Sequence, residues 1–147
     1  MKDPAIAPAA ADTAVTDLSL AIGQLVRRLR QEANPNELSW SQIATLARLE
    51  KAGAMTTAEL ARAEFVKPQS MGTTLADLEQ EGLVRRRPHP TDGRQVLFEL
   101  TAHGFEARRQ RNIAKREWLM AAMEKLAPAE QQTLIAAAAL IKRLAES

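Results

Sequence analysis

A single change of hydrophobic period, between residues 83 and 100, constrains this fold more than any other feature of the sequence. On both sides of it, apolar residues recur at steps of three and four, which is typical of amphipathic helices. Within it, Val96, Phe98 and Leu100 fall on one side of an alternating pattern, which is typical of a strand. Residues 88–93 hold two prolines and an Asp-Gly pair, which favour a tight turn. The sequence therefore predicts a two-stranded β-hairpin between two blocks of helices.

Capping signals divide the helical blocks into separate helices. Ser39 with Gln42, and Thr56 with Glu59, fit capping boxes at helix starts. Pro68 stands near the first position of a further helix, where its missing N–H costs nothing. After an Ala/Pro-rich stretch that we expect to be a flexible arm (residues 1–12), the predicted helices are 13–34, 39–53, 57–64, 67–82, 101–126 and a last one from 128 onward.

The order of these elements indicates the fold class. A short helix, a tight link, a longer helix and a β-hairpin follow one another between residues 57 and 100. This is the order of elements in a winged helix-turn-helix. We therefore predict a mainly α fold with a minor α+β component.

Composition excludes several classes of protein. The chain of 147 residues suits one domain, and because it has no cysteine it has no disulfide, zinc ribbon or thiol switch. Aromatic residues make up only 3%, which argues against a single-strand nucleic-acid binder that stacks bases. No membrane-length apolar run, signal peptide, phosphate loop, nucleophile elbow or metal-ligand spacing is present. We expect a soluble cytoplasmic protein that is not an enzyme and carries no cofactor or metal.

Charge is concentrated although the net charge is only +2. One basic tract is Arg85-Arg86-Arg87 with Arg94 nearby, and a second spans residues 108–116. A focused tract can bind an anion even when the whole chain is almost neutral. For the second tract, an exposed helical face is the default interpretation.

Three motifs in a fixed order carry a family resemblance. They are Leu-Glu-x-x-Gly-Leu-Val from residue 78, Asp-x-Arg from residue 92 and Leu-Thr-x-x-Gly from residue 100. With this set, the chain resembles the MarR family of bacterial transcriptional regulators over about residues 13–145. The resemblance implies a single domain over residues 13–147. Helices at about 13–34 and 102–147 would interlock in a homodimer base, and the DNA-binding lobe would span about 38–101. It also implies a repressor released by a small aromatic or phenolic inducer.

The helix at residues 67–81 is the candidate recognition helix, because a helix fits the major groove. Its apolar positions would face the core, which leaves four polar candidates for base or phosphate contact: Gln69, Ser70, Thr73 and Thr74. Gly72 either permits close approach to DNA or is a tolerated variation. Many family members carry an arginine where Thr73 stands, so we expect weaker or shape-based specificity.

The hairpin tip is the candidate wing. An arginine on a stiff tip can enter a narrow minor groove, and the resemblance gives that role to Arg94, with Asp92 holding the wing. The alternative is a surface ion pair of little consequence. Arg85 and Arg86 are candidates for phosphate contact, because side chains alternate along a strand, and their alternative is a solvated face.

Three residues in segments that match the family's pocket walls are candidates for an inducer pocket between the dimer base and the DNA lobe: Trp40, Met55 and Trp118. Core packing is the alternative for each. We predict a dimeric, sequence-specific regulator bound to a pseudo-palindromic site on double-stranded DNA. The competing hypothesis is a winged-helix module for protein–protein contact without a DNA role. The acidic residues Asp77, Glu79 and Glu81 slightly favour that hypothesis.

Overall fold

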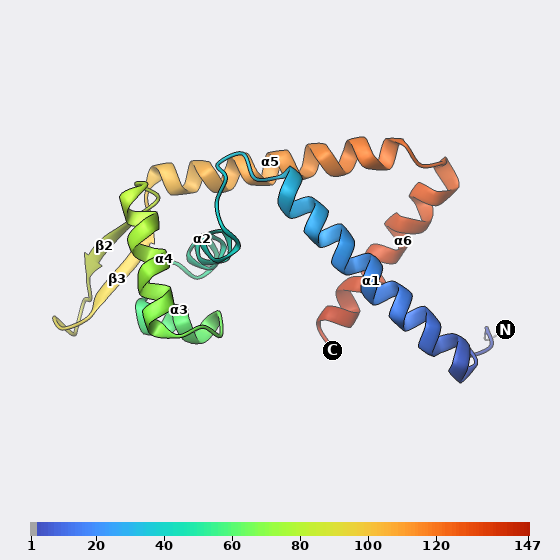
Figure 1. The fold of residues 1–147 in the computed structure, drawn as a ribbon, viewed down its shortest axis with the longest axis horizontal. Helices are drawn as coiled ribbons and strands as arrows, with labels where there is room; N and C mark the ends of the chain where they lie inside the picture. Colours follow the sequence, from blue (N-terminus) through green and yellow to red (C-terminus); the bar gives the residue numbers. More distant parts are fainter. Residues whose placement is uncertain (1–2) are drawn as a thin grey trace. The chain divides into compact units, whose positions relative to one another are not determined.

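The computed structural model describes residues 3–147, which form six helices and a three-stranded antiparallel sheet (Figure 1). The elements are α1 (Pro8–Glu32), α2 (Trp40–Ala52), β1 (Met55–Thr56), α3 (Thr57–Ala63), α4 (Pro68–Gln80), β2 (Val84–Pro88), β3 (Val96–Leu100), α5 (Ala102–Glu124) and α6 (Pro128–Ala145). The prediction of a mainly α, winged helix-turn-helix fold is confirmed. None of the helices in the described range is long and apolar enough to cross a membrane.

The chain divides into two compact units. One unit spans residues 34–113, and the other combines residues up to 33 with residues 114–147. The first unit, which we call the winged-helix lobe, contains α2, α3, α4, the sheet and the start of α5. The second, which we call the terminal-helix unit, contains α1, α6 and the rest of α5.

Local signals account for the helix boundaries in the winged-helix lobe. The Ser39 hydroxyl accepts from the backbone N–H of Gln42 at 3.2 Å, and the Gln42 side chain accepts from the Ser39 N–H at 2.8 Å. This confirms the capping box at the start of α2. Gly53, with φ of +80°, ends α2 in a backbone conformation that favours glycine.

The lobe buries one face of each helix against the sheet. Leu46, Leu60, Leu75 and Leu78 are almost fully buried and join α2, α3 and α4 in one cluster with Phe98 of β3. Since the large apolar residues of α4, Met71, Leu75 and Leu78, all point into this cluster, its other positions are left to the surface. The core therefore fixes which face of α4 is available to a partner.

The sheet has one more strand than the sequence predicted. β3 lies in the centre, paired with β2 on one side and with the two-residue strand β1 on the other, where Met55 faces Phe98. A strand of two residues is too short to show an alternating pattern. Val96 falls on the same side of the alternating pattern as the buried Phe98 and Leu100 but is exposed, since it pairs with Pro88 at the outer end of the ladder. Leu97, on the other side of the pattern, is buried.

Thr101 and Gly104 fix the start of α5 in the lobe. The Thr101 hydroxyl donates to the carbonyl of Gly82 at 2.6 Å and accepts from the Gly104 N–H at 3.0 Å. The Cα of Gly104 lies so close to the Leu83 carbonyl that a side chain there would clash with it. The first turn of α5 is thereby held against the chain between α4 and β2.

In the terminal-helix unit, α1 begins earlier than predicted. Residues 8–12, expected in a flexible arm, are helical because Pro8 suits a first helical position and alanine has the highest helix propensity. Residues 1–2 of the predicted arm lie outside the described range. The guanidinium of Arg28 lies 5.9 Å from the ring centroid of Trp118, within this unit.

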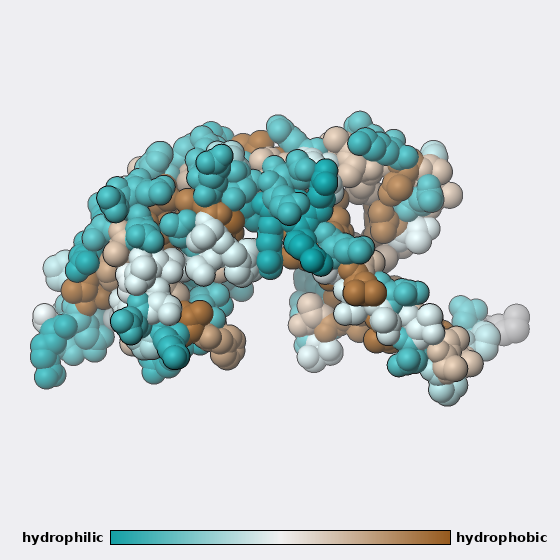
Figure 2. Space-filling model, viewed as in Figure 1, coloured by the Kyte–Doolittle hydropathy of each residue, from teal (hydrophilic) through white to brown (hydrophobic). Residues whose placement is uncertain are grey.

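Both terminal helices expose large apolar side chains, and Figure 2 shows several of them on the surface. They are Val15, Leu18, Leu20, Ile22, Leu25 and Val26 on α1, and Leu134, Ile135, Leu140, Ile141 and Leu144 on α6. Neither helix contains a buried residue. Apolar surface gathered in this way is typical of an interface rather than of a monomer's exterior.

Candidate nucleic-acid interface

Helix α4 presents a polar and nearly chargeless amino-terminal half. Met71, Leu75 and Leu78 are at most 2% exposed, whereas Gln69 and Thr73 are exposed on the other side. Residues 68–80 include no lysine or arginine. This face can therefore offer hydrogen bonds and methyl groups to a partner, but no guanidinium or ammonium group.

The two threonine hydroxyls of α4 are turned toward the helix's own backbone. Thr73 donates to the Gln69 carbonyl and Thr74 to the Ser70 carbonyl, each at 3.2 Å. A hydroxyl that bonds the preceding turn has used its proton there, although its oxygen can still accept. Sequence alone does not fix this choice of rotamer.

The wing turn is held by a network around Asp92. One carboxylate oxygen accepts from the Arg94 N–H at 3.0 Å, and the other accepts from the Gln95 side chain at 3.1 Å. His89 adds support, since its Nδ1 accepts from the N–H groups of Thr91 at 3.3 Å and Asp92 at 3.1 Å. The Arg94 side chain is 94% exposed, with only a 3.5 Å contact from Nε to Asp92. A braced turn thus carries a projecting arginine.

The backbone N–H of Arg94 is the main cause that lowers the pKa of Asp92 below its ordinary value of 3.8, and desolvation opposes it. Because the pKa of Asp92 is lower in the folded than in the unfolded state, the ionised carboxylate stabilises the wing at pH values above the unfolded-state pKa. That contribution is lost as the pH falls through the lowered value. We expect the Asp92 carboxyl carbon, followed by NMR, to titrate below 3.8 in the folded protein and near 3.8 in urea. A folded-state midpoint at or above 3.8 would contradict the proposed network.

The arginines of β2 are paired with carboxylates in the same lobe. Arg85 and Arg87 share Glu99 of β3, at 2.8 and 3.2 Å. Arg86 points the other way, 3.0 Å from Glu79 of α4 and 5.4 Å from the Phe98 ring centroid. Since a guanidinium has five donors, these contacts orient each side chain and leave donors for a phosphate.

A groove lies between the start of α3 and the wing. It is lined by Thr57, Glu59 and Arg62 on one side and by Arg94 and Gln95 on the other. The neighbouring Thr56 hydroxyl accepts from the Glu59 N–H at 3.2 Å, which is the capping role expected from the sequence. The groove thus brings two arginines, 62 and 94, together from segments far apart in the chain.

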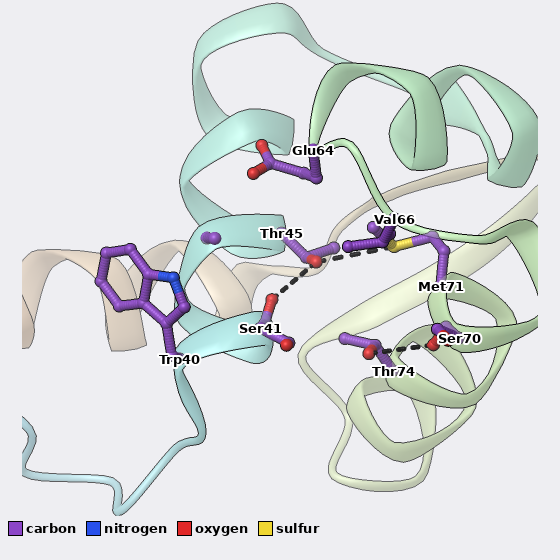
Figure 3. A pocket seen from close by; sticks show the side chains of 9 residues that line it. Trp40, Ser41, Thr45, Glu64, Val66, Ser70, Met71 and Thr74 are labelled. Carbon is purple, nitrogen blue, oxygen red and sulfur yellow. Dashed lines mark hydrogen bonds between the residues drawn. The ribbon is translucent and has the colours of Figure 1, made fainter.

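A second hollow, of about 90 Å³, lies between α2 and α4 (Figure 3). Trp40, Val66 and Met71 give it apolar walls, and Ser70 and Thr74 of α4 line it as well. Its remaining lining residues are Ser41, Ala44, Thr45 and Glu64. A molecule bound here would touch the same helix that presents the polar face.

The turn between α3 and α4 contains an unusual residue. Phe65 is 95% exposed and has a φ of +55°, in the left-handed region that bulky residues rarely adopt. The flanking backbone holds it there, since the Phe65 and Val66 N–H groups donate to the carbonyls of Arg62 and Ala61. An apolar ring therefore projects immediately before α4.

Comparison with known proteins decides the family. The profile described as the MarR family matches residues 38–96, which include α2, α3, α4 and β2. The HTH-type transcriptional regulator MT0903.1 of Mycobacterium tuberculosis is 40% identical over 131 residues, 89% of this chain and 92% of that protein. The chain belongs to the MarR family.

Other relatives extend this assignment. The HTH-type transcriptional repressor MdtR of Bacillus subtilis is 28% identical over 142 residues, 93% of this chain and 89% of that protein. A Staphylococcus aureus MepR mutant, solved bound to an oligodeoxyribonucleotide, superposes with a TM-score of 0.69 at 19% identity. The match covers 90% of this chain and 96% of that one. This MarR-family chain is thus a transcriptional regulator with a winged-helix fold.

Within this MarR-family fold, the predicted residues fall into three groups. The structure places Gln69, Ser70, Thr73 and Thr74 on α4, Arg85 and Arg86 on β2, and Asp92 and Arg94 in the wing turn, all within the winged-helix lobe. Of the pocket candidates in this lobe, Trp40 lines the hollow of Figure 3 and Met55 packs against the core from β1. Trp118 belongs to the terminal-helix unit.

Sequence reasoning missed Arg62 at this interface, which lines the same groove as Arg94. His89 has a structural role, as expected for this residue, because it braces the wing turn. Arg62 stands on the polar side of a short helix, which by itself is the ordinary place for an arginine. Only the tertiary structure places it in the same groove as Arg94.

Proposed function

We propose that this MarR-family regulator binds a pseudo-palindromic site on double-stranded DNA as a homodimer. One observation carries the proposal: the same lobe presents the polar face of α4 and an exposed arginine on a braced wing turn. Those two elements suit neighbouring major and minor grooves. The DNA-bound state of MepR, whose fold is similar, supports this assignment.

The exposed apolar faces of α1 and α6 support the homodimer. A second copy of these helices would bury that surface and give two recognition helices related by a two-fold axis. Two half-sites would then lie about one helical turn, roughly 34 Å, apart. The DNA contacts would come from Gln69, Ser70, Thr73 and Thr74, with Arg85, Arg86 and Arg94 at the backbone and minor groove.

We further propose that the dimer is a repressor released by a small aromatic ligand. The name of MdtR as a repressor supports the first part. The hollow lined by Trp40 and by Ser70 and Thr74 of α4 supports the second, because an occupant would compete with DNA for α4. Such a ligand would favour the unbound lobe over the DNA-bound one and so shift the population.

The test is to recover duplexes from a random-sequence library with the full chain and to measure binding by fluorescence anisotropy. We expect one enriched inverted-repeat sequence and an affinity that falls steeply as salt rises, since phosphate contacts release counterions. Sedimentation should give a dimer. A stable monomer, or no enriched duplex even at low ionic strength, contradicts the proposal and favours a protein–protein module.

A further inference from the structure

The outward row of α4 consists of small or uncharged side chains. Gln69, Thr73 and Ala76 are exposed and lie one helical turn apart in succession. Gly72 lies beside them, and no heavy atom stands within 4 Å of the position a Cβ would take there. The acidic Asp77 and Glu79 follow on the carboxyl-terminal half, and Glu79 is already paired with Arg86.

This row cannot make the guanine contact that is commonest in protein–DNA complexes. That contact uses the donors of arginine or lysine, and residues 68–80 contain neither. In this row of Gln69, Thr73 and Ala76, the groups that remain are the Gln69 amide, which can pair with adenine, the Thr73 hydroxyl oxygen, which can still accept, and methyl groups, which can pack on the thymine C5-methyl.

The side-chain conformation of Thr73 determines which of its groups can contact a partner. Its hydroxyl is held at 3.2 Å from the Gln69 carbonyl, on the helix's own backbone. The γ-methyl, on the same β-carbon, is then the group left to face a partner. Ala76, one turn further along, presents a second methyl.

We propose that α4 recognises A·T base pairs and that the γ-methyl of Thr73 packs against the C5-methyl of a thymine in each half-site. This inference rests on the proposed function, since it requires that α4 enter the major groove. The missing side chain at Gly72 lets the helix approach the bases closely enough for this contact. Phosphate attraction comes from outside α4, from Arg94 and the arginines of β2.

The experiment uses the duplex recovered from the random library and replaces one thymine at a time by uracil, which removes only the C5-methyl. For the wild-type chain, we expect uracil at one position in each half-site to lower the affinity for the duplex about fourfold. This is the size of effect expected for one buried methyl group. Substitution in both half-sites should lower it by roughly the product of the two effects.

Three variants assign the effect to Thr73. Thr73→Ser keeps the hydroxyl and loses the methyl, so it should bind the thymine and uracil duplexes equally. Thr73→Val keeps a methyl and should retain the discrimination. Thr133→Ser on α6 is the matched control, because Thr133 bonds the preceding turn in the same way, at 3.0 Å, and should behave as wild type.

The outcomes separate this inference from the function it rests on. Specific binding with no uracil effect at any position overturns the inference and leaves the proposed function standing. If the uracil effect is as large in Thr73→Ser as in the wild-type chain, another residue makes the thymine contact, and the inference is again overturned. Failure to enrich any duplex contradicts the proposed function itself.

Discussion

Replacing Gly104 by alanine is expected to lower the free energy of unfolding by about 3 kcal/mol, the upper range for overpacking a buried site. The added methyl would clash with the Leu83 carbonyl oxygen and would also lie 3.3 Å from the Leu100 side chain. The backbone cannot easily yield, because the same carbonyl accepts from the Thr101 N–H at 3.1 Å. Urea denaturation at fixed protein concentration measures the effect.

Gly72→Ala is the control for this prediction. Gly72 also lies in a helix of the winged-helix lobe, but a Cβ there meets nothing within 4 Å. Alanine should therefore stabilise the fold by up to about 1 kcal/mol, through its higher helix propensity. An unfolding free energy for Gly104→Ala within about 0.5 kcal/mol of wild type, the usual range of a harmless surface change, would show that α5 does not approach Leu83 so closely.

The second large effect is expected on DNA binding. Arg94→Ala should weaken binding to the recovered duplex about tenfold or more and make it less sensitive to salt, because it removes one basic contact from each half-site. The Arg94 side chain is 94% exposed, and its contact to Asp92 is an exposed pair that costs little to give up. Fluorescence anisotropy over a series of salt concentrations measures both changes.

Arg109→Ala provides the comparison, since Arg109 is also an exposed arginine paired with a carboxylate, that of Glu106 at 2.9 Å. It should bind DNA as wild type does. Both variants should sediment like the wild-type chain. Equal affinities of Arg94→Ala and wild type would remove the wing from the proposed mechanism.

Much of the winged-helix lobe could be predicted because its signals are local. Each signal involves residues only a few positions apart in the chain. Examples are the capping box of Ser39, the proline at the start of α4 and the turn before β3. The same holds for the buried face of α4, which follows from the helical period. The candidate DNA-contact residues were then the polar residues outside the buried face of that helix and those at the wing turn.

The interface itself depended on contacts between distant segments. Glu99 and Glu79 orient the arginines of β2, and Arg94 of the wing lines the same groove as Arg62 of α3. No spacing in the sequence indicates which carboxylate an arginine will meet. For the same reason the sequence did not indicate that Met55 would pair with Phe98 in the sheet.

The sequence by itself determined the helices, the hairpin and the identity of the outward residues on α4, because these depend on periodicity and on neighbours within one turn. Only the tertiary structure decided the third strand, the partners of the basic residues and the close approach at Gly104. It also decided that Thr73 turns its hydroxyl inward. These features depend on the packing of segments far apart in the chain and on the side-chain rotamers of the folded state. Neither long-range packing nor a rotamer can be recognised from the periodicity of the sequence.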